Sequence, residues 1–302
     1  MTYTTANREP TDPLMPNQDD VEGIQPDRLF YATGVLLDAQ DFQTEQLYHR
    51  SRLAQVLRYL GGSGTVAGLE VVWKRRVEPG QTDPSEEKGV VYPNGRDEEI
   101  RVQPGLAIDR LGRLIEVTRP RCIRLDRWVI QNQASLLIQD SPYNGIVADV
   151  FLRFVVRERG RTPAVAAGPF DALDAVTPSR LRDGSELHLV ARSEPADQLP
   201  TKLPIDPWSS ISTLPVADRS AALHRLMFDA WQGTNARSGG DLDPLPEHRP
   251  NQPTTDLFLA RLILPATLID GIVNRTVDAT VTVENQHRRF IYPIPAIVQL
   301  LA

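Results

Sequence analysis

The chain has 302 residues and a formal net charge of −6, with basic and acidic residues interleaved along its length. This pattern excludes the positive surface typical of a nucleic-acid-binding protein, and a single cysteine excludes an internal disulfide. An aromatic content of 6% argues against stacking platforms for sugars or single-stranded nucleic acid. Twenty-five prolines and nineteen glycines indicate a loop-rich and strand-rich chain rather than a helical bundle.

The sequence also lacks the usual signals for export or membrane insertion. Its N-terminal residues have neither the basic cap nor the apolar core of a secretory signal peptide. The most apolar window, residues 145–156, contains Asp149 and Arg153 and is shorter than the roughly 20 residues that a membrane-spanning helix needs. We therefore expect a soluble, cytoplasmic protein that meets a membrane only through its partners.

The chain divides into four parts. Residues 1–27 are polar and proline-bearing without periodicity, which is typical either of a disordered tail or of an arm that becomes ordered on a neighbour. A helix plus β domain is expected at 28–192, a linker or loop at 193–216, and a helix and β segment at 217–302 that completes the same sheet system. The predicted fold is α+β and mainly β: a long N-terminal helix packed on antiparallel β-sheets, with an extended arm and long proline-rich loops.

The first predicted helix begins at Asp38. This side chain can accept hydrogen bonds from the first-turn amides, and Asp41 adds negative charge at the same end. Side chains then recur every three or four residues on one stripe, which we expect to pack on a sheet. Glycines supply the helix stop and the turn into a strand. The structural core is predicted at Phe42, His49, Leu53, Leu57, Gly62, Gly64 and Gly68.

The middle of the chain indicates β structure. The clearest signal is a hairpin at 104–117, in which Asp109 and Gly112 provide the turn. Asp126 is expected to cap a helix that continues to residue 138. A long strand at 146–156, with both faces partly apolar, suits a sandwich or a partner interface. A loop is expected at 160–180, followed by a strand at 184–194.

The last third alternates between proline-rich stretches and regular elements. Asp218 is expected to cap a helix, and residues 233–255 form a proline-rich loop of a length that favours contact with something else. Two or three strands follow, and the apolar C-terminus is expected to be buried. Short basic runs at 74–76 and 288–289 could meet an acidic partner, although such runs are more often solvated.

No pattern typical of an enzyme stands out. Glu45 and His49 lie four residues apart on the predicted helix, where a hydrogen-bonded structural pair is favoured over two metal ligands. Cys122 is interpreted as a small buried residue rather than a reactive thiolate. The glycine-rich run at 61–70 follows a helix and lacks the Lys-Ser/Thr ending of a phosphate-binding loop. We expect no enzymatic activity, no cofactor and no metal.

Residues 32–71 carry a longer pattern, a G-x-L-L-x-x-x-D-F-x-x-E-Q-x-Y-x-R run followed by a G-x-G-x-V-x-G-L-E-V strand. It resembles the N-terminal signature of a family of proteins encoded beside the baseplate genes of phage-tail-like contractile injection systems. Looser similarity continues at 104–117, 178–187 and 283–290. The matching residues are Gly34, Leu36, Leu37, Asp41, Phe42, Glu45, Gln46, Tyr48, Arg50, Gly62, Gly64, Val66, Gly68, Leu69, Glu70 and Val71.

The resemblance implies a structural baseplate component that acts through protein–protein interfaces, in multiple copies per particle. Its partners would be wedge, spike or sheath-proximal subunits, without nucleic acid, in a particle that is free in the cytoplasm or docked on a membrane. An alternative is a module that binds a surface receptor or a glycan at the particle rim, and a third is a metal-dependent hydrolase. The interface candidates are Pro10, Pro13, Pro16, Pro244, Pro246 and Pro250.

Overall fold

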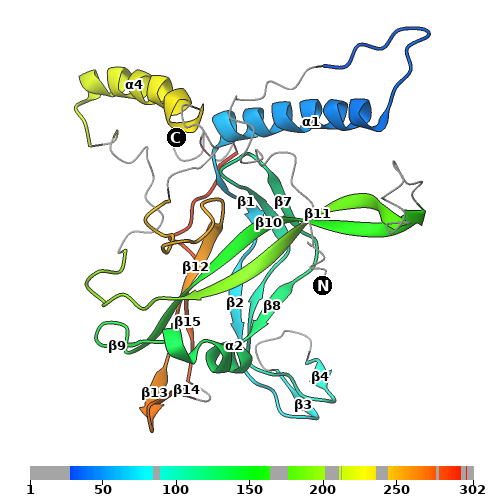
Figure 1. Cartoon of the computed structure of the whole chain (residues 1–302). Coiled ribbons are helices and arrows are strands. Elements are labelled where there is room, and N and C mark those ends of the chain that lie inside the picture. Colours follow the sequence, from blue (N-terminus) through cyan, green and yellow to red (C-terminus); the bar gives the residue numbers. More distant parts are fainter. Residues whose placement is uncertain are drawn as a thin grey trace, which may run out of the picture.

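A computed structural model of the chain describes residues 28–83, 89–163, 176–200, 211, 213–235, 244–276, 279–293 and 297. Within these residues the protein is mainly β, with three α-helices and several antiparallel sheets, so it has the predicted α+β character (Figure 1). The predictions for the arm at 1–27, with Pro10, Pro13 and Pro16, fall outside the described residues. The same holds for the apolar C-terminus except Ile297, which is exposed.

The helices are α1 (Ala39–Val56), α2 (Leu125–Gln131) and α4 (Val216–Asn235), with a π-helical turn at Leu57–Gly61 and a 3-10 turn at Gln133–Ser135. The strands are β1 (Gly64–Gly68), β2 (Val71–Lys74), β3 (Gln81–Thr82), β4 (Val91–Tyr92), β5 (Glu99–Val102), β6 (Gly105–Ile108), β7 (Leu114–Val117), β8 (Arg121–Arg124), β9 (Ile138–Gln139), β10 (Gly145–Pro163), β11 (Val176–Ala191), β12 (Leu257–Leu264), β13 (Ala266–Ile269), β14 (Ile272–Arg275) and β15 (Thr282–Glu284).

Helix α1 begins directly after Asp38, which is its N-cap residue. The Asp38 carboxylate accepts hydrogen bonds from the amides of Gln40 at 2.8 Å and Asp41 at 3.0 Å, and the Asp38 amide donates to the Asp41 carboxylate at 2.9 Å. This capping box satisfies amides that have no partner inside the helix. After the π-helical turn, Gly62 takes a φ of +73°, which lets the chain turn into β1.

The largest sheet has the strand order β11-β10-β12-β15, and β9 also pairs with β10. Strand β12 comes from the C-terminal part of the chain yet lies beside β10, with Ala260 opposite Val150. Two smaller sheets, β1-β6-β7 and β2-β5-β8, hold the earlier strands, and β3-β4 and β13-β14 form separate hairpins. The predicted hairpin at 104–117 is confirmed as β6 and β7, with the Asp109 carboxylate bonded to turn amides.

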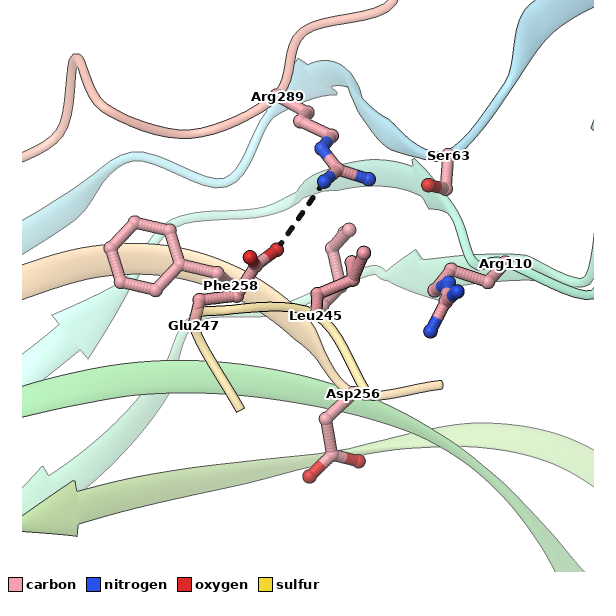
Figure 2. Close-up of a pocket in the computed structure, with 8 residues that line it drawn as sticks. Ser63, Arg110, Leu245, Glu247, Asp256, Phe258 and Arg289 are labelled. Atoms are coloured by element: carbon pink, nitrogen blue, oxygen red, sulfur yellow. Dashed lines mark ion pairs between the residues drawn. The ribbon is translucent and has the colours of Figure 1, made fainter. Parts of the chain in front are cut away.

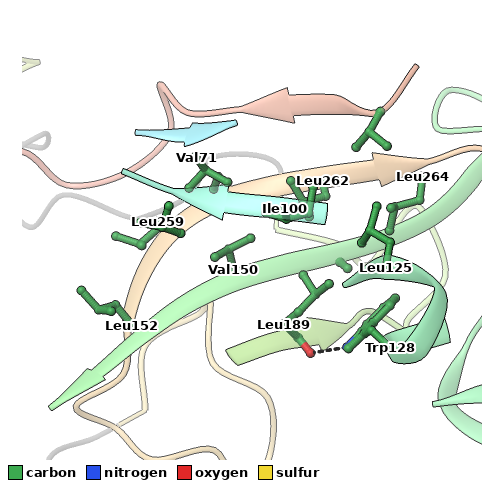
Figure 3. Packing of buried hydrophobic residues seen from close by; sticks show 14 of the residues in the cluster. Val71, Ile100, Leu125, Trp128, Val150, Leu152, Leu189, Leu259, Leu262 and Leu264 are labelled. Atoms are coloured by element: carbon green, nitrogen blue, oxygen red, sulfur yellow. Dashed lines mark hydrogen bonds between the residues drawn. The ribbon is translucent and has the colours of Figure 1, made fainter. Parts of the chain in front are cut away.

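One hydrophobic core lies between the large sheet and the β2-β5-β8 sheet (Figure 3). Helix α2 closes one end of it, where the indole of Trp128 donates to the carbonyl oxygen of Leu189 at 2.8 Å. A buried indole N–H needs such a partner, so this bond helps to place α2. The core residues labelled in Figure 3 are Val71, Ile100, Leu125, Trp128, Val150, Leu152, Leu189, Leu259, Leu262 and Leu264.

Two predicted helix caps are wrong. Asp126 lies inside the first turn of α2, because strand β8 leads directly into the helix and the amide of Leu125 donates to the carbonyl of Glu98 at 3.0 Å. Asp218 lies inside the first turn of α4, where its amide donates to the carbonyl of Pro215 at 2.9 Å. Both carboxylates still lie at the positive N-terminal end of a helix. An acidic residue at this end looks the same in the sequence whether it caps the helix or lies in its first turn.

The loop predicted at 160–180 is also wrong at both of its ends. Strand β10 continues to Pro163 and β11 already begins at Val176. The two strands keep one constant register along their whole length, and Gly160 takes a φ of +65° without shifting it. Cross-strand pairing therefore overrides the local loop signal of glycine and proline.

Candidate functional site

Helix α1 rests on the body through its small and polar side chains. Ala54 is buried, and Gly112 of the β6–β7 turn lies so close that an added Cβ would be 1.9 Å from the Ala54 carbonyl oxygen. Arg50 adds an ion pair, 3.7 Å from Asp183 on β11. The turn after β6 and the β11 strand therefore contact α1 from one side. The opposite side of the helix points away from the body.

The apolar stripe of α1 faces solvent. Phe42 is 50% exposed, Leu53 is 59% exposed and Leu60 is 86% exposed, and the side chain of His49 is also exposed. The prediction that Phe42, His49 and Leu53 are core residues is therefore wrong, while Leu57 is half-buried. A helical pattern identifies an apolar face but does not say whether it meets its own sheet. The α1 stripe consists of Phe42, His49, Leu53, Val56 and Leu60.

The segment before α1 also exposes apolar side chains. Phe30 and Leu36 are exposed, and Tyr31 is held to the helix by a hydrogen bond from its hydroxyl to the Glu45 carboxylate. Large apolar side chains that gather on the surface of a folded domain are typical of contact sites. Figure 1 shows α1 at one end of the molecule, away from α2. The stripe and the preceding segment together form the candidate site.

The predicted structural glycines follow the helix. Gly64 takes a φ of +156°, and a Cβ there would be 2.8 Å from the carbonyl oxygen of Arg289. Gly68 takes a φ of +63° beside the backbone of Pro104. At Gly62, in contrast, only the positive φ requires glycine, because no heavy atom lies within 4 Å of an added Cβ.

The described part of the proline-rich loop folds back onto its own sheet. Arg249 donates to the carbonyl of Ala191 at 2.8 Å, and buried Arg192 donates to the carbonyl of Glu247. Residues 244–256 therefore contact the large sheet, which the sequence did not indicate. Pro244, Pro246 and Pro250 remain exposed on this loop, and their predicted role as interface residues stays a prediction.

This loop and Ser63, directly before the start of β1, line a small pocket (Figure 2). Glu247 forms an ion pair with Arg289 across it, with 3.7 Å between Nη2 and Oε1. Asp256 points to the opposite side in Figure 2, where Arg153 clamps its carboxylate with bonds of 2.7 and 2.9 Å. A carboxylate held in this way has a structural role as a hydrogen-bond acceptor and is not free to act as a general base.

His248 is the histidine of this loop, and both of its ring nitrogens are occupied. Nδ1 accepts a hydrogen bond from the amide of Leu245 at 3.0 Å, so Nε2 carries the proton and donates to the carbonyl of Asp256 at 2.9 Å. The ring also lies 5.9 Å from that of Phe151, between centroids. His248 is therefore a neutral structural side chain that holds the loop on β10 and β12.

We expect the protein to lose stability as the pH falls through the range in which histidine titrates. Burial lowers the pKa of His248 below its ordinary value, which the unfolded chain retains. Between these two values the unfolded state binds more protons, so acid favours unfolding. Urea midpoints measured from about pH 7.5 down to about pH 5.5 should fall, and should fall less in His248→Gln. An equal fall in both proteins would contradict the role given to this histidine.

Three further sequence interpretations have structural outcomes. Glu45 and His49 lie on the surface of α1 with 3.9 Å between Oε1 and Nε2, which is too far for the predicted hydrogen bond. Cys122 is exposed on β8, so its interpretation as a buried residue is wrong; partial desolvation and its hydrogen bond with Glu99 raise its pKa, which disfavours the thiolate. Arg288 is not solvated: it is buried, donates to the carbonyl of Leu69 at 2.6 Å, and burial lowers its pKa to about 10.

The described residues offer no group of three or more His, Cys, Asp or Glu that could hold a metal ion. Nor does that part of the chain contain a helix long and apolar enough to cross a membrane. No protein-family model matches the sequence, and no curated protein matches it. The α1 stripe is therefore the feature from which a function can be argued.

Proposed function

We propose that the protein is a structural baseplate component of a phage-tail-like contractile injection system and that it acts through protein–protein interfaces. The observation that carries this proposal is the α1 stripe, because a helix that turns its apolar face to solvent needs a second surface to cover it. The pattern that resembles the baseplate-associated family spans the same helix, from Gly34 to Arg50, and continues into the strand that ends at Val71.

The stripe suits a groove or a second helix in a neighbouring subunit. Phe42, Leu53 and Leu60 are large side chains, and burying such a side chain contributes roughly 1.5–3 kcal/mol. Apolar anchors at helical spacing are the usual way in which a helix docks on a partner. In this proposal the long N-terminal helix packs on another subunit rather than on its own sheets, and the arm and the proline-rich loops add contacts at the edges.

A pull-down of the tagged full chain from cells that carry the gene tests this proposal. We expect sheathed, tail-like particles in negative-stain images, with the tag at one end. The variant Phe42→Ser/Leu53→Ser/Leu60→Ser should reduce incorporation into particles by about tenfold or more, because apolar anchors dominate such interfaces. Its urea midpoint should stay close to that of the wild type, since all three side chains are exposed.

The chain provides a matched control. Leu268, Ile269 and Ile272 are similarly exposed on the β13–β14 hairpin, at the other end of the molecule in Figure 1. Replacing these three with serine removes as much exposed apolar surface, and incorporation should persist. Recovery of the wild type only as a monomer or a small oligomer would contradict the assembly role. Equal loss of incorporation in both triple variants would show that the α1 stripe is not the contact.

A further inference from the structure

The outer part of the β10–β11 hairpin carries two facing pairs of arginines on one face, and Arg161 continues the row on the same face of β10. Arg157 lies opposite Arg182, and Arg159 lies opposite Arg180, in the antiparallel register. Residues directly opposite one another, or two apart on one strand, point to the same side of a sheet. All four are exposed, on a hairpin that projects sideways from the body in Figure 1. We call Arg157, Arg159, Arg180 and Arg182 the arginine ladder.

The arginine ladder is expected to lower the stability of the hairpin. Like charges directly opposite on neighbouring strands destabilise a sheet. In the part of the chain that the structure describes, none of the four guanidinium groups forms an ion pair. Two nearby acidic residues, Glu158 and Asp183, lie on the other face of the hairpin, where Arg50 of α1 engages Asp183. Glu186 is on the ladder face but lies nearer the body, opposite Arg153. An anionic partner outside the chain would offset this repulsion.

The same hairpin presents strand edges for such a partner. β11 is the terminal strand of the described sheet, and β12 covers the other side of β10 only as far as Leu152. Beyond that residue, the described hairpin has no further strand along either side. Unpaired backbone N–H and C=O groups along an edge are a template for an added strand.

We propose that the arginine ladder and its strand edge bind an extended acidic segment of another protein, with carboxylates at alternate positions. Alternate residues of a strand are about 7 Å apart on both chains, so the carboxylates would match the arginine spacing. A second copy of this hairpin is excluded, since arginine would then face arginine. A nucleic acid is disfavoured because the whole chain has a net charge of −6 and because a phosphodiester backbone, which only accepts hydrogen bonds, cannot pair with the carbonyl groups of the strand edge.

This surface is separate from the α1 stripe, and its test does not depend on the baseplate assignment. The probe is a labelled peptide of about ten residues in which threonine and glutamate alternate, a length that matches a typical strand or slightly exceeds it. Fluorescence anisotropy with the full chain should show saturable binding that weakens at high salt. A peptide in which lysine replaces glutamate should not bind, and methylation of alternate backbone nitrogens should abolish binding by the glutamate peptide.

The decisive comparison uses two double variants with the same charge change. Arg157→Thr/Arg182→Thr should bind the glutamate peptide roughly tenfold more weakly, yet unfold at the same or a higher urea concentration because one repulsive pair is gone. Arg119→Thr/Arg121→Thr, which removes two exposed arginines elsewhere, should bind normally. Absence of saturable binding would overturn the proposal. So would equal binding by both variants, or stronger binding to a short DNA duplex or to anionic lipid vesicles than to the peptide.

Discussion

Asp149→Asn is expected to lower the free energy of unfolding by about 3–5 kcal/mol, the range found when a buried ion pair loses one partner. Asp149 is fully buried in β10 and accepts hydrogen bonds from two buried arginines. Arg261 of β12 donates from Nε at 2.8 Å and from Nη2 at 3.1 Å, and Arg192 donates from its Nε. The substitution leaves the Arg261 guanidinium in the protein interior without its carboxylate, and leaves Arg192 with only its longer contact to Glu194, at 3.4 Å. Urea unfolding followed by tryptophan fluorescence measures the loss.

A surface control separates this effect from a general loss of charge. Asp270 is exposed in the β13–β14 turn with a φ of +52°, a conformation that asparagine tolerates, so Asp270→Asn should change stability by less than about 0.5 kcal/mol. Replacing the whole buried cluster, as Asp149→Leu/Arg192→Met/Arg261→Met, should recover part of the loss because no uncompensated charge remains. A triple variant that is less stable than Asp149→Asn would contradict this explanation.

Features that depend on near neighbours in the chain could be predicted from the sequence. The cap at Asp38 and the turn at Asp109 and Gly112 use partners within four residues, so residue type and spacing determine them. The alternating apolar residues at 146–156 likewise predict the central strand, since a period of two residues belongs to the strand itself.

Features that depend on distant partners could not be predicted in this way. Arg288 is buried because Leu69, far away in the sequence, supplies a carbonyl oxygen for it. Asp149 interrupts an apolar strand, and that interruption was a signal that the sequence reasoning missed: a carboxylate there requires buried cations. The arginine ladder was similarly visible as alternate arginines before and after the expected loop, yet its meaning depends on the register of β10 and β11.

The α1 stripe illustrates a third kind of feature, one whose pattern the sequence shows but whose contact partner it does not. The spacing of Phe42, Leu53 and Leu60 specifies one side of a helix equally well whether that side meets the chain's own sheet or another molecule. The deciding contact is the approach of Gly112 to Ala54, which places the opposite side of α1 on the body. If α1 docks on a partner, as proposed, that partner covers the apolar side, and reading the chain as a single domain wrongly assigns this side to the core.

Substitution of one glycine after α1 is also expected to lower the stability of the protein strongly. Gly68→Ala should lower the free energy of unfolding by at least about 3 kcal/mol, because two costs combine. The residue takes a φ of +63°, and its new Cβ would lie 2.2 Å from the carbonyl oxygen of Pro104, which is backbone and cannot rotate away. That carbonyl accepts the hydrogen bond from the amide of Leu69 at 3.2 Å, so relieving the clash separates β1 from β6.

Gly62→Ala is the matched control, since Gly62 has a similar φ of +73° but open space around the position of the new Cβ. It should cost only about 1–2 kcal/mol, the strain of a left-handed alanine alone. The difference between the two urea midpoints therefore measures the close approach of β1 to β6 separately from backbone strain. Equal losses of unfolding free energy in the two variants would mean that β6 shifts to accept the methyl group. Hydrogen exchange at the Leu69 amide would then be faster in Gly68→Ala, although its global stability would be no lower than that of Gly62→Ala.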